Sequence, residues 1–280
     1  MHPCEWWEKL SPSVDLQDTR LYFEPAAHDP ASAPLLVLIH GATVPAWELS
    51  LLVPKLVDRG WNCLSFDLIG HGESSMASGP YDHGAFLEQV SRVLDALPVK
   101  EFYILGHSLG GMLAASWASQ QRGRLLGLAL AAPLVDFDQG RTARQLLKLP
   151  LIGNVLVYAV LLPSLIIRRM WRYRTFDRGQ FGWWFAQQAL KPGFGQALKN
   201  LLTSGVLDDQ LHRYEGLAKE VSKIIVLRGS EDEVFALGHK QRLTDVLREA
   251  LQVEVPNTGH SLHLSEPAFV AKSLDQLLMT

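Results

Sequence analysis

The sequence predicts an α/β fold, in which a doubly wound, mostly parallel sheet carries an inserted helical cap. Six short runs are apolar throughout rather than at every second position, which is typical of strands covered on both faces. The runs are Leu35–His40, Asn62–Asp67, Phe102–Gly106, Leu125–Ala131, Ile224–Gly229 and Leu251–Val255. Helical stretches separate them, at Pro45–Arg59, Gly84–Leu97, Gly110–Gln121 and Gly238–Ala250. This alternation of strand and helix predicts the fold class.

The alternation stops between Val135 and Arg213, where the sequence becomes helical, aromatic and apolar. Glycine and proline mark breaks inside this stretch, for example at Pro163 and Gly182. We therefore expect a core formed by residues 1–134 and 214–280 and a helical cap formed by residues 135–213. Open α/β sheets bind their ligands at the carboxyl ends of their strands, so the cap is expected to cover that edge.

The overall composition fits an ordinary globular protein that acts on a small molecule. Of 280 residues, 48% are hydrophobic and 20% are charged, and the net charge of −3 is too small to favour nucleic acid. Cys4 and Cys63 are too few for a disulfide framework. The N-terminal sequence MHPCEWWEKL lacks the basic and then apolar pattern of an export signal. These features predict a cytoplasmic location.

The segment Leu149–Ile167 is apolar over nearly the length of a membrane crossing. Four residues are expected to interrupt it, namely Pro150, Asn154, Pro163 and Ser164. We interpret the segment first as helices that cover an apolar pocket. Contact with a membrane surface is the alternative, because four arginines follow at once: Arg168, Arg169, Arg172 and Arg174. A true membrane span is the least favoured interpretation.

A candidate nucleophile lies in the pentapeptide Gly106-His107-Ser108-Leu109-Gly110. The pattern Gly-x-Ser-x-Gly is weak alone, but here a predicted strand precedes it and a predicted helix follows it. A serine on such a sharp turn has a strained backbone, and the flanking glycines avoid collisions. The start of the helix favours negative charge on a reacting oxygen. Ser108 is therefore the predicted nucleophile.

A serine hydroxyl needs a neighbouring base, which is most often a histidine oriented by a carboxylate. His260 follows the last predicted strand and Asp232 follows the strand before it, so both are expected at the same sheet edge as Ser108. His263 is an alternative base, although its surroundings appear helical. The alternative acids are Glu231, Glu233, Asp136 and Asp138.

The reaction also requires N–H donors for the oxyanion that develops on the substrate. The residue after the nucleophile, Leu109, supplies one backbone N–H. The second is expected from the loop after Leu35–His40, where Ala42 is the first candidate and Thr43 the alternative.

Together these segments resemble the α/β-hydrolase superfamily over nearly the whole chain outside the cap. The resemblance rests on His40-Gly41, on the stretch Asp67–Ser74 and on the motifs GHSLGG, GSEDEV and NTGH. It implies a structural role for His71 within Asp67–Ser74. Haloalkane dehalogenases and epoxide hydrolases carry an aspartate at the position of Ser108, so the resemblance argues against those activities.

The residues predict a serine hydrolase that cleaves a carboxylic ester with an apolar acyl or alcohol part. Lactone cleavage, C–C bond cleavage and a monoacylglycerol-type lipase activity at a membrane fit the same motifs, as does a non-catalytic ligand receptor. No cofactor and no metal ion are expected, because no His-Glu-x-x-His helix or paired-cysteine ligand set occurs. The motifs leave the oligomeric state open.

Overall fold

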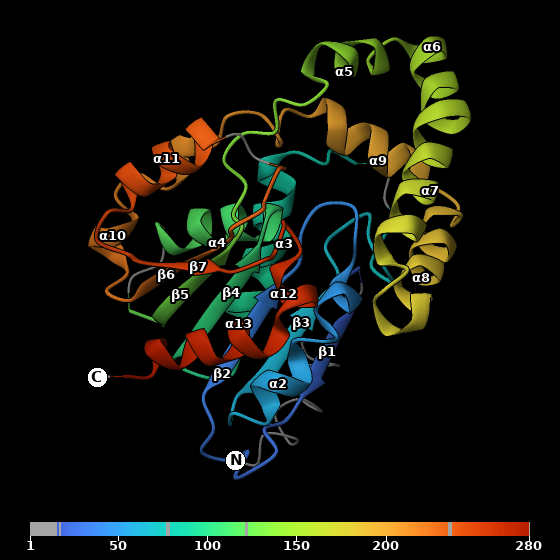
Figure 1. Ribbon diagram of the computed structural model, residues 1–280. Helices are drawn as coiled ribbons and strands as arrows, with labels where there is room; N and C mark the ends of the chain where they lie inside the picture. The colour runs from blue at the N-terminus through green and yellow to red at the C-terminus, as the bar shows by residue number, and fades with distance from the viewer. Residues whose placement is uncertain (1–15, 17, 77–78, 121–122, 235–236, 280) are drawn as a thin grey trace.

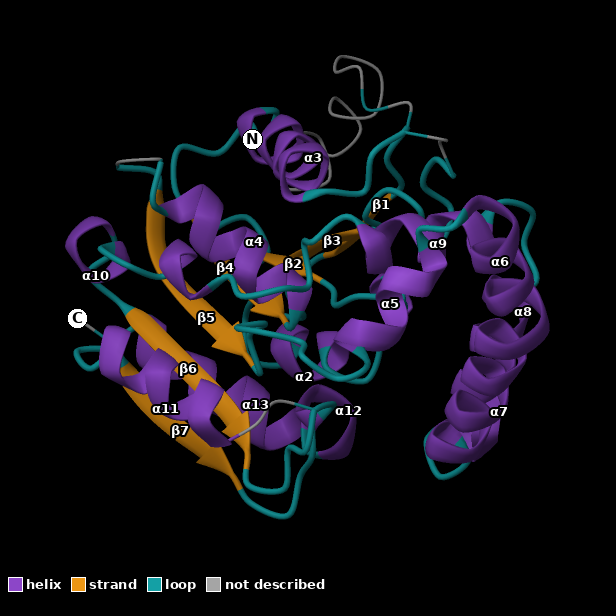
Figure 2. Cartoon of the chain, turned by 90° about the horizontal axis from the view of Figure 1, so that it is seen from above, coloured by secondary structure: helices purple, strands orange, loops and turns teal. Residues whose placement is uncertain are grey.

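The computed structural model describes residues 16–279 apart from residues 17, 77–78, 121–122 and 235–236. Within these residues, strands form one sheet in the order β1-β3-β2-β4-β5-β6-β7 (Figures 1 and 2). The strands are β1 Leu21–Glu24, β2 Leu35–Ile39, β3 Asn62–Phe66, β4 Phe102–His107, β5 Leu125–Ala131, β6 Ile224–Gly229 and β7 Leu251–Val255. Only β1 is antiparallel to its neighbour, so the predicted mostly parallel sheet is confirmed.

Strand β1 is absent from the sequence-based prediction. It has four residues, pairs with β3 at the sheet edge and is half-buried. A short edge strand with one covered face has no continuous apolar run, so it lacks the signal that identified the other six.

Helices cover both faces of the sheet. They are η1 Ala46–Leu49, α2 Val53–Val57, α3 His83–Asp95, α4 Leu109–Ala118, α10 Leu217–Glu220, α11 Leu237–Val246, α12 Leu262–Ser265, α13 Pro267–Ser273 and η5 Leu274–Leu277. Along β2, Val37 and Ile39 pack with α3 and α4, whereas Leu36 and Leu38 pack with α2 and α13. Burial of alternate residues on opposite faces explains the continuous apolar runs.

The helix expected over Pro45–Arg59 is instead two short elements, the 3-10 turn η1 and the helix α2. Pro54 lies in the first turn of α2, where its missing N–H costs no helical hydrogen bond. Proline is favoured at the beginning of a helix, so α2 begins close to Pro54 and the expected single helix is divided.

Among the described residues, only helices lie between β5 and β6. They are α5 Arg141–Leu147, α6 Pro150–Val155, the π-helical turn η2 Leu156–Leu161, α7 Leu162–Tyr173, η3 Asp177–Gly179, α8 Gln180–Ala189, α9 Phe194–Thr203 and η4 Leu211–Arg213. In Figure 1, α6, α7 and α8 stand beside the sheet, to its right. The segment is helical as expected, while its exact limits as a cap, residues 135 and 213, stay a prediction.

The apolar segment at Leu149–Ile167 is not interrupted as the sequence suggested. Elements α6, η2 and α7 form one helix from Pro150 to Tyr173, which is long and apolar enough to cross a membrane by length and composition. Pro163 lies directly after the π-helical turn, where the wider hydrogen-bond spacing accommodates its missing N–H. Only 17% of the most apolar 18-residue window is buried, so most of this helix does not cover a pocket.

Aromatic side chains attach the cap helices to the core. Trp47 of η1 contacts Tyr173 of α7 and both Phe181 and Trp184 of α8, with ring centroids 5.5–6.5 Å apart. Edge-on contacts between aromatic rings are favourable beyond the area they bury. The end of α7 and the helix α8 are therefore held against η1, the element that follows β2.

Three sequence-based expectations concern residues outside the described part of the chain. These are Cys4, the N-terminal segment MHPCEWWEKL and the terminal Gln121 of the helix expected at Gly110–Gln121. Cys63 is buried in β3, and burial raises the pKa of its thiol.

Candidate active site

Ser108 lies on the sharp turn between β4 and α4. Its backbone has φ 52° and ψ −115°, a conformation that is strained for a residue with a side chain. A Cβ on Gly106 would lie 2.3 Å from the carbonyl oxygen of Gly110, and one on Gly110 would lie 2.2 Å from that of Ile39. Side chains at both positions would therefore collide with the backbone, which explains why the turn needs glycine there.

The structure brings Ser108, His260 and Asp232 together, although they come from three separate loops. The Nε2 of His260 lies 3.0 Å from the Oγ of Ser108, and its Nδ1 lies 3.0 Å from the Oδ2 of Asp232. Asp232 follows β6 and His260 follows β7, at the carboxyl ends of these parallel strands. The hydrogen bonds connect hydroxyl, imidazole and carboxylate in the order that general-base activation requires.

The alternative residues lie elsewhere. His263 is the second residue of α12, is fully buried, and contacts His107 rather than Ser108. Asp136 pairs with Arg141 and lies 3.8 Å from His239. Glu231 and Glu233 are exposed. Of the candidate bases and acids, His260 and Asp232 are the pair hydrogen-bonded to Ser108 and to each other.

The surroundings of His260 and Asp232 shift the pKa of both groups below their ordinary values. Burial lowers the pKa of His260, and the hydrogen bond that it donates to Asp232 only partly opposes this effect. Burial raises the pKa of Asp232, but the hydrogen bond and the charge of His260 outweigh burial and hold it below its ordinary value. A neutral imidazole beside an ionised carboxylate is the state in which His260 can accept a proton.

The loop after β2 passes directly beside the nucleophile. A Cβ added to Gly41 would lie 3.2 Å from the Cβ of Ser108. The N–H of Leu109 lies at the first position of α4, where the helix itself offers it no acceptor. The N–H of Thr43 donates to Nε2 of His71 at 3.0 Å, so this alternative donor is already used. Ala42 is left as the better candidate for the second oxyanion donor.

His71 supports this loop rather than reacting. Its Nδ1 lies 2.9 Å from the carbonyl oxygen of Ile69, and its Nε2 accepts the N–H of Thr43. These contacts require a neutral ring with the proton on Nδ1. Burial and the nearby His40 lower the pKa of His71 to about 3, which agrees with that state. Its contacts fit the structural role that the resemblance implied.

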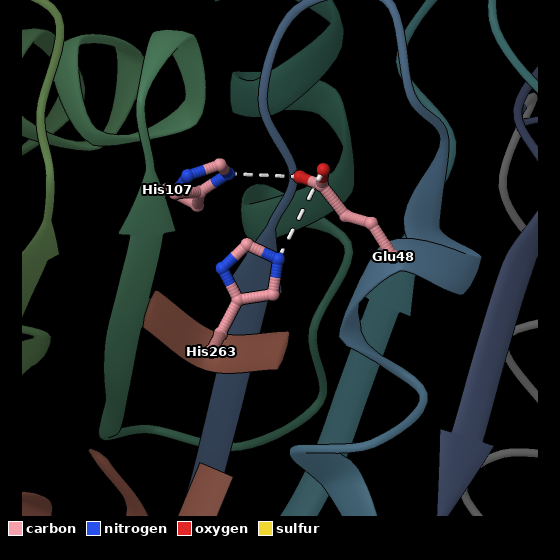
Figure 3. A group of neighbouring side chains, drawn as sticks. All are labelled: Glu48, His107 and His263. Carbon is pink, nitrogen blue, oxygen red and sulfur yellow. Dashed lines mark hydrogen bonds and ion pairs between the residues drawn. The ribbon is translucent and has the colours of Figure 1, made fainter. Parts of the chain in front are cut away.

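Glu48, His107 and His263 form a buried group (Figure 3), and His107 directly precedes Ser108 in the chain. Glu48 accepts the N–H of Gly41 at 2.7 Å and contacts Nδ1 of His107 at 2.9 Å. Nε2 of His107 lies 3.2 Å from the carbonyl oxygen of His260. Because both neighbours of the His107 ring are acceptors, both contacts are hydrogen bonds only when the ring carries two protons. The geometry therefore suits a buried ion pair between Glu48 and His107.

The pKa directions of the other two members agree with this ion pair. Burial raises the pKa of Glu48, but the charge and hydrogen bond of His107 outweigh burial and hold it well below its ordinary value. Burial and His107 lower the pKa of His263 to about 3. These directions favour an ionised Glu48 and a neutral His263.

The same three residues are the one group of potential metal ligands found among the described residues, with ligand atoms within 4.8 Å of one another. Neither ring nitrogen of His263 has a hydrogen-bond partner in the described part of the chain. A metal ion would have to replace the existing contact between Glu48 and His107, which are both buried. The arrangement fits an ion pair better than a metal centre.

The sequence analysis missed Glu48 altogether and did not predict the contact that Arg169 makes with the loop after β2. Arg169 of α7 donates to the Oγ1 of Thr43 at 3.1 Å and thereby ties the cap to the loop after β2. A charged residue between Trp47 and Leu49 could have drawn attention to Glu48, since charges are rarely buried unless paired. Nothing in the sequence distinguishes Arg169 from the three neighbouring arginines.

A small cavity lies between α9 and the loops after β2 and β3. Its volume is about 10 Å³, close to the least that a water molecule requires. Its walls are mostly apolar and are formed by Thr43, Gly70, His71, Tyr81, Phe194, Ala197, Leu198 and Leu201. Thr43 is the neighbour in sequence of the proposed oxyanion donor Ala42, so this apolar space borders the loop that carries that donor.

Comparisons with known proteins agree with the geometry. A family model described as "Alpha/beta hydrolase family" matches residues 36–273. Phospholipase YtpA of Bacillus subtilis is 31% identical over 111 residues, 37% of this chain and only 42% of that protein. The 2-hydroxymuconate semialdehyde hydrolase of Pseudomonas sp. (strain CF600) is 24% identical over 267 residues, 90% of this chain and 89% of that protein.

Solved structures show the same fold. An esterase from Exiguobacterium antarcticum superimposes with a TM-score of 0.74 at 15% sequence identity, covering 93% of this chain and 96% of that chain. At such low identity the similarity concerns the fold and not the substrate.

Proposed function

The chain belongs to the α/β-hydrolase family, and we propose that it is a serine hydrolase that cleaves carboxylic esters with an apolar acyl or alcohol part. The observation that carries the proposal is the hydrogen-bonded series from Ser108 through His260 to Asp232, with 3.0 Å at each step. Ser108 is the nucleophile, His260 the general base, and Asp232 the acid that orients the imidazole.

In the proposed reaction, His260 removes the proton of Ser108 while the Oγ attacks the ester carbonyl carbon. The oxygen of the resulting tetrahedral intermediate is negative, and the backbone N–H groups of Leu109 and Ala42 stabilise it. His260 then donates the proton to the leaving alcohol, and the acyl group stays on Ser108. Water, activated by His260, releases the acid in the same manner.

The apolar part of the substrate is inferred from the cavity beside the loop after β2. Its wall toward the cap consists of Phe194, Ala197, Leu198 and Leu201 of α9, which offer no charged group. Apolar pockets with a few well-placed polar groups are typical of sites for small organic ligands. An acyl chain or an apolar alcohol fits this environment better than a charged group does.

Cleavage of a C–C bond is the second candidate function. It is supported by the similarity over 90% of the chain to a protein named 2-hydroxymuconate semialdehyde hydrolase. Lactone cleavage would use the same residues, and a lipase acting on monoacylglycerols would use them at a membrane. A receptor without catalysis, the proposal from another class, is disfavoured by the hydrogen-bonded contacts of Ser108.

Two measurements test the proposal. A fluorophosphonate probe should label wild-type protein at Ser108 and leave Ser108→Ala unlabelled; failure to label wild type would indicate a receptor. A series of nitrophenyl esters of increasing chain length should then be hydrolysed at rates that Ser108→Ala loses. If the probe labels Ser108 but no ester reacts, the esterase assignment fails and the C–C bond hydrolase is the candidate that remains to be assayed.

A further inference from the structure

The helix formed by α6, η2 and α7 exposes an unusual amount of apolar surface. Its outer side carries six large apolar residues, which we call the docking face: Leu151, Ile152, Val155, Val160, Ile167 and Trp171. Their exposed fractions range from 54% for Ile152 to 83% for Leu151. Contiguous apolar surface of this kind is rare on soluble monomers and marks interaction sites.

The π-helical turn aligns the docking face along the helix. Val155 and Ile167 are twelve residues apart in the chain. Because a π-helical turn contains about one residue more than an α-helical turn, this separation corresponds to about three full turns, and both side chains lie on the same side of the helix. The inner residues show the same adjustment: Gly153, Val157 and Leu162 are buried at spacings of four and then five. One side of the helix therefore packs against α8 and α9, while the opposite side stays apolar and exposed.

The helical segment that carries the docking face is rich in basic residues. From the start of α5 to the end of α9, residues 141–203 contain ten lysines and arginines and one aspartate, a formal charge of +9. The rest of the chain contains 16 basic and 28 acidic residues, a formal charge of −12. The charges are thus strongly separated between the two parts, although the whole chain carries only −3. Such a basic segment is complementary to an anionic surface.

Side chains at the end of α7 have the arrangement expected at a lipid headgroup. Arg168, Arg172 and Arg174 are exposed. The guanidinium of Arg174 lies 4.0 Å from the centroid of the Trp171 ring. Tryptophan and arginine favour the boundary between hydrocarbon and water, where the ring and the charge find different surroundings.

We propose that the docking face binds the surface of a bilayer that contains anionic phospholipids, with the helix lying parallel to the membrane. Amphipathic helices bind in this way when an apolar face enters the acyl boundary and basic residues contact headgroups. The apolar face supplies the insertion, and the exposed Arg168, Arg172 and Arg174 supply the preference for anionic lipid. The proposal does not depend on which bond the enzyme cleaves.

A membrane span is excluded by the connectivity. The helix lies between β5 and β6 in the chain, and these strands are neighbours in one sheet, paired at Leu128 and Ile224. If the helix crossed a membrane, the chain after it would have to cross a second time to return to the sheet. The next helix, α8, has ten residues and spans about 15 Å, half of a hydrocarbon core of roughly 30 Å.

Sedimentation of the full-length protein with vesicles tests the proposal. We expect binding to vesicles of phosphatidylcholine and phosphatidylserine in equal parts, and about tenfold weaker binding to phosphatidylcholine alone. Raising the salt concentration should weaken the binding, because exposed charges are screened. Ser108→Ala should bind like wild type, so a failure of the proposed hydrolysis would be distinguishable from a failure of docking.

Matched variants locate the contact. Ile152→Ser and Leu151→Asp should each weaken binding about tenfold, whereas Met279→Ser, which is similarly exposed on the core, should not. Arg168→Gln combined with Arg172→Gln should weaken binding to anionic vesicles by about tenfold, and Lys100→Gln combined with Arg248→Gln should leave it unchanged. The substituted side chains are exposed, and thermal unfolding verifies that each variant is folded.

Three results would overturn the proposal. The first is that wild type does not sediment with anionic vesicles. The second is that the variants of the docking face and the core controls bind equally well. The third is that the face pairs with a second copy of the chain, seen as a dimer that dissociates in Leu151→Asp and shows no vesicle binding.

Discussion

The catalytic edge of the sheet and the docking face differ in almost every physical property. At the catalytic edge, Ser108, Asp232 and Glu48 are at least nine-tenths buried, and each has a hydrogen-bond partner. On the docking face, large side chains such as Leu151 are mostly exposed. The polar side chains of the catalytic edge find their hydrogen-bond partners inside the molecule. The apolar side chains of the docking face can be covered only by another molecule or by a membrane.

The two proposals together assign different tasks to the core and the helical segment. Reaction chemistry requires fixed geometry and tuned protonation, which a rigid sheet edge provides. Surface recognition requires area and charge, which a basic amphipathic helix provides. Arg169 connects the two regions, since it extends from α7 to Thr43 in the loop beside the nucleophile. The following predictions test the separation, in order of decreasing effect.

Asp232→Asn should lower kcat for ester hydrolysis by about 10⁴-fold, because an amide no longer holds His260 in the required tautomer. Asp136→Asn should change kcat little, since Asp136 pairs with Arg141 and lies near His239, away from the His260 ring. Steady-state kinetics of both purified variants measure the difference. Equal losses would show that Asp136 shares the role of orienting acid.

Glu48→Gln should lower the free energy of unfolding by about 3 kcal/mol, because His107 would lose the counter-charge of a buried ion pair. Ile152→Ser on the docking face should change it by less than about 0.5 kcal/mol, since that side chain is already exposed. Urea unfolding of wild type and both variants compares the two regions. A larger effect at Ile152 would mean that the docking face is covered within the protein itself.

Arg169→Gln should lower kcat by about tenfold, because Thr43 has a positive φ of 72° and loses a hydrogen bond that holds its side chain. Arg168→Gln is the matched control and should leave kcat unchanged. Measuring kcat and KM separately distinguishes a misplaced oxyanion donor, which lowers kcat, from weaker substrate binding, which raises KM. An unchanged kcat would show that the cap does not support the catalytic loop.

The acid limb of the kcat/KM profile should lie below pH 6.5, the ordinary value for imidazole, because burial lowers the pKa of His260. Stability should fall over the same range, since His71 and His263 also have lowered pKa values and the unfolded chain binds more protons than the folded chain as the pH falls. A pH series of activity and thermal unfolding measures both effects. An acid limb above pH 6.5 would contradict a neutral, buried His260.

Local patterns were sufficient to predict most of the fold. The six long apolar runs became strands because each is covered on both faces, and β1 was missed because it is not. The motif around Ser108 predicted a strand-to-helix turn, since its glycines are required by contacts within the turn and with β2. His260 and Asp232 could be predicted because their loops follow parallel strands, whose carboxyl ends lie at one edge of the sheet.

Other features depended on packing between distant segments. The burial of Glu48 beside His107 joins residues 59 positions apart, and the bond from Arg169 to Thr43 joins residues 126 positions apart. No local pattern encodes such distances. The segment Leu149–Ile167 is a continuous helix, and most of it is exposed. The sequence could not show this, since composition shows that a helix is apolar but not which side of it finds a partner.

The sequence by itself determined the strand order along the chain, the glycine turn at Ser108 and the candidate base and acid, because these follow from residue type and short-range spacing. Only the tertiary structure decided which charges are buried together and which apolar surface is left uncovered. Burial is a property of two surfaces that meet, and a linear pattern describes only one of them.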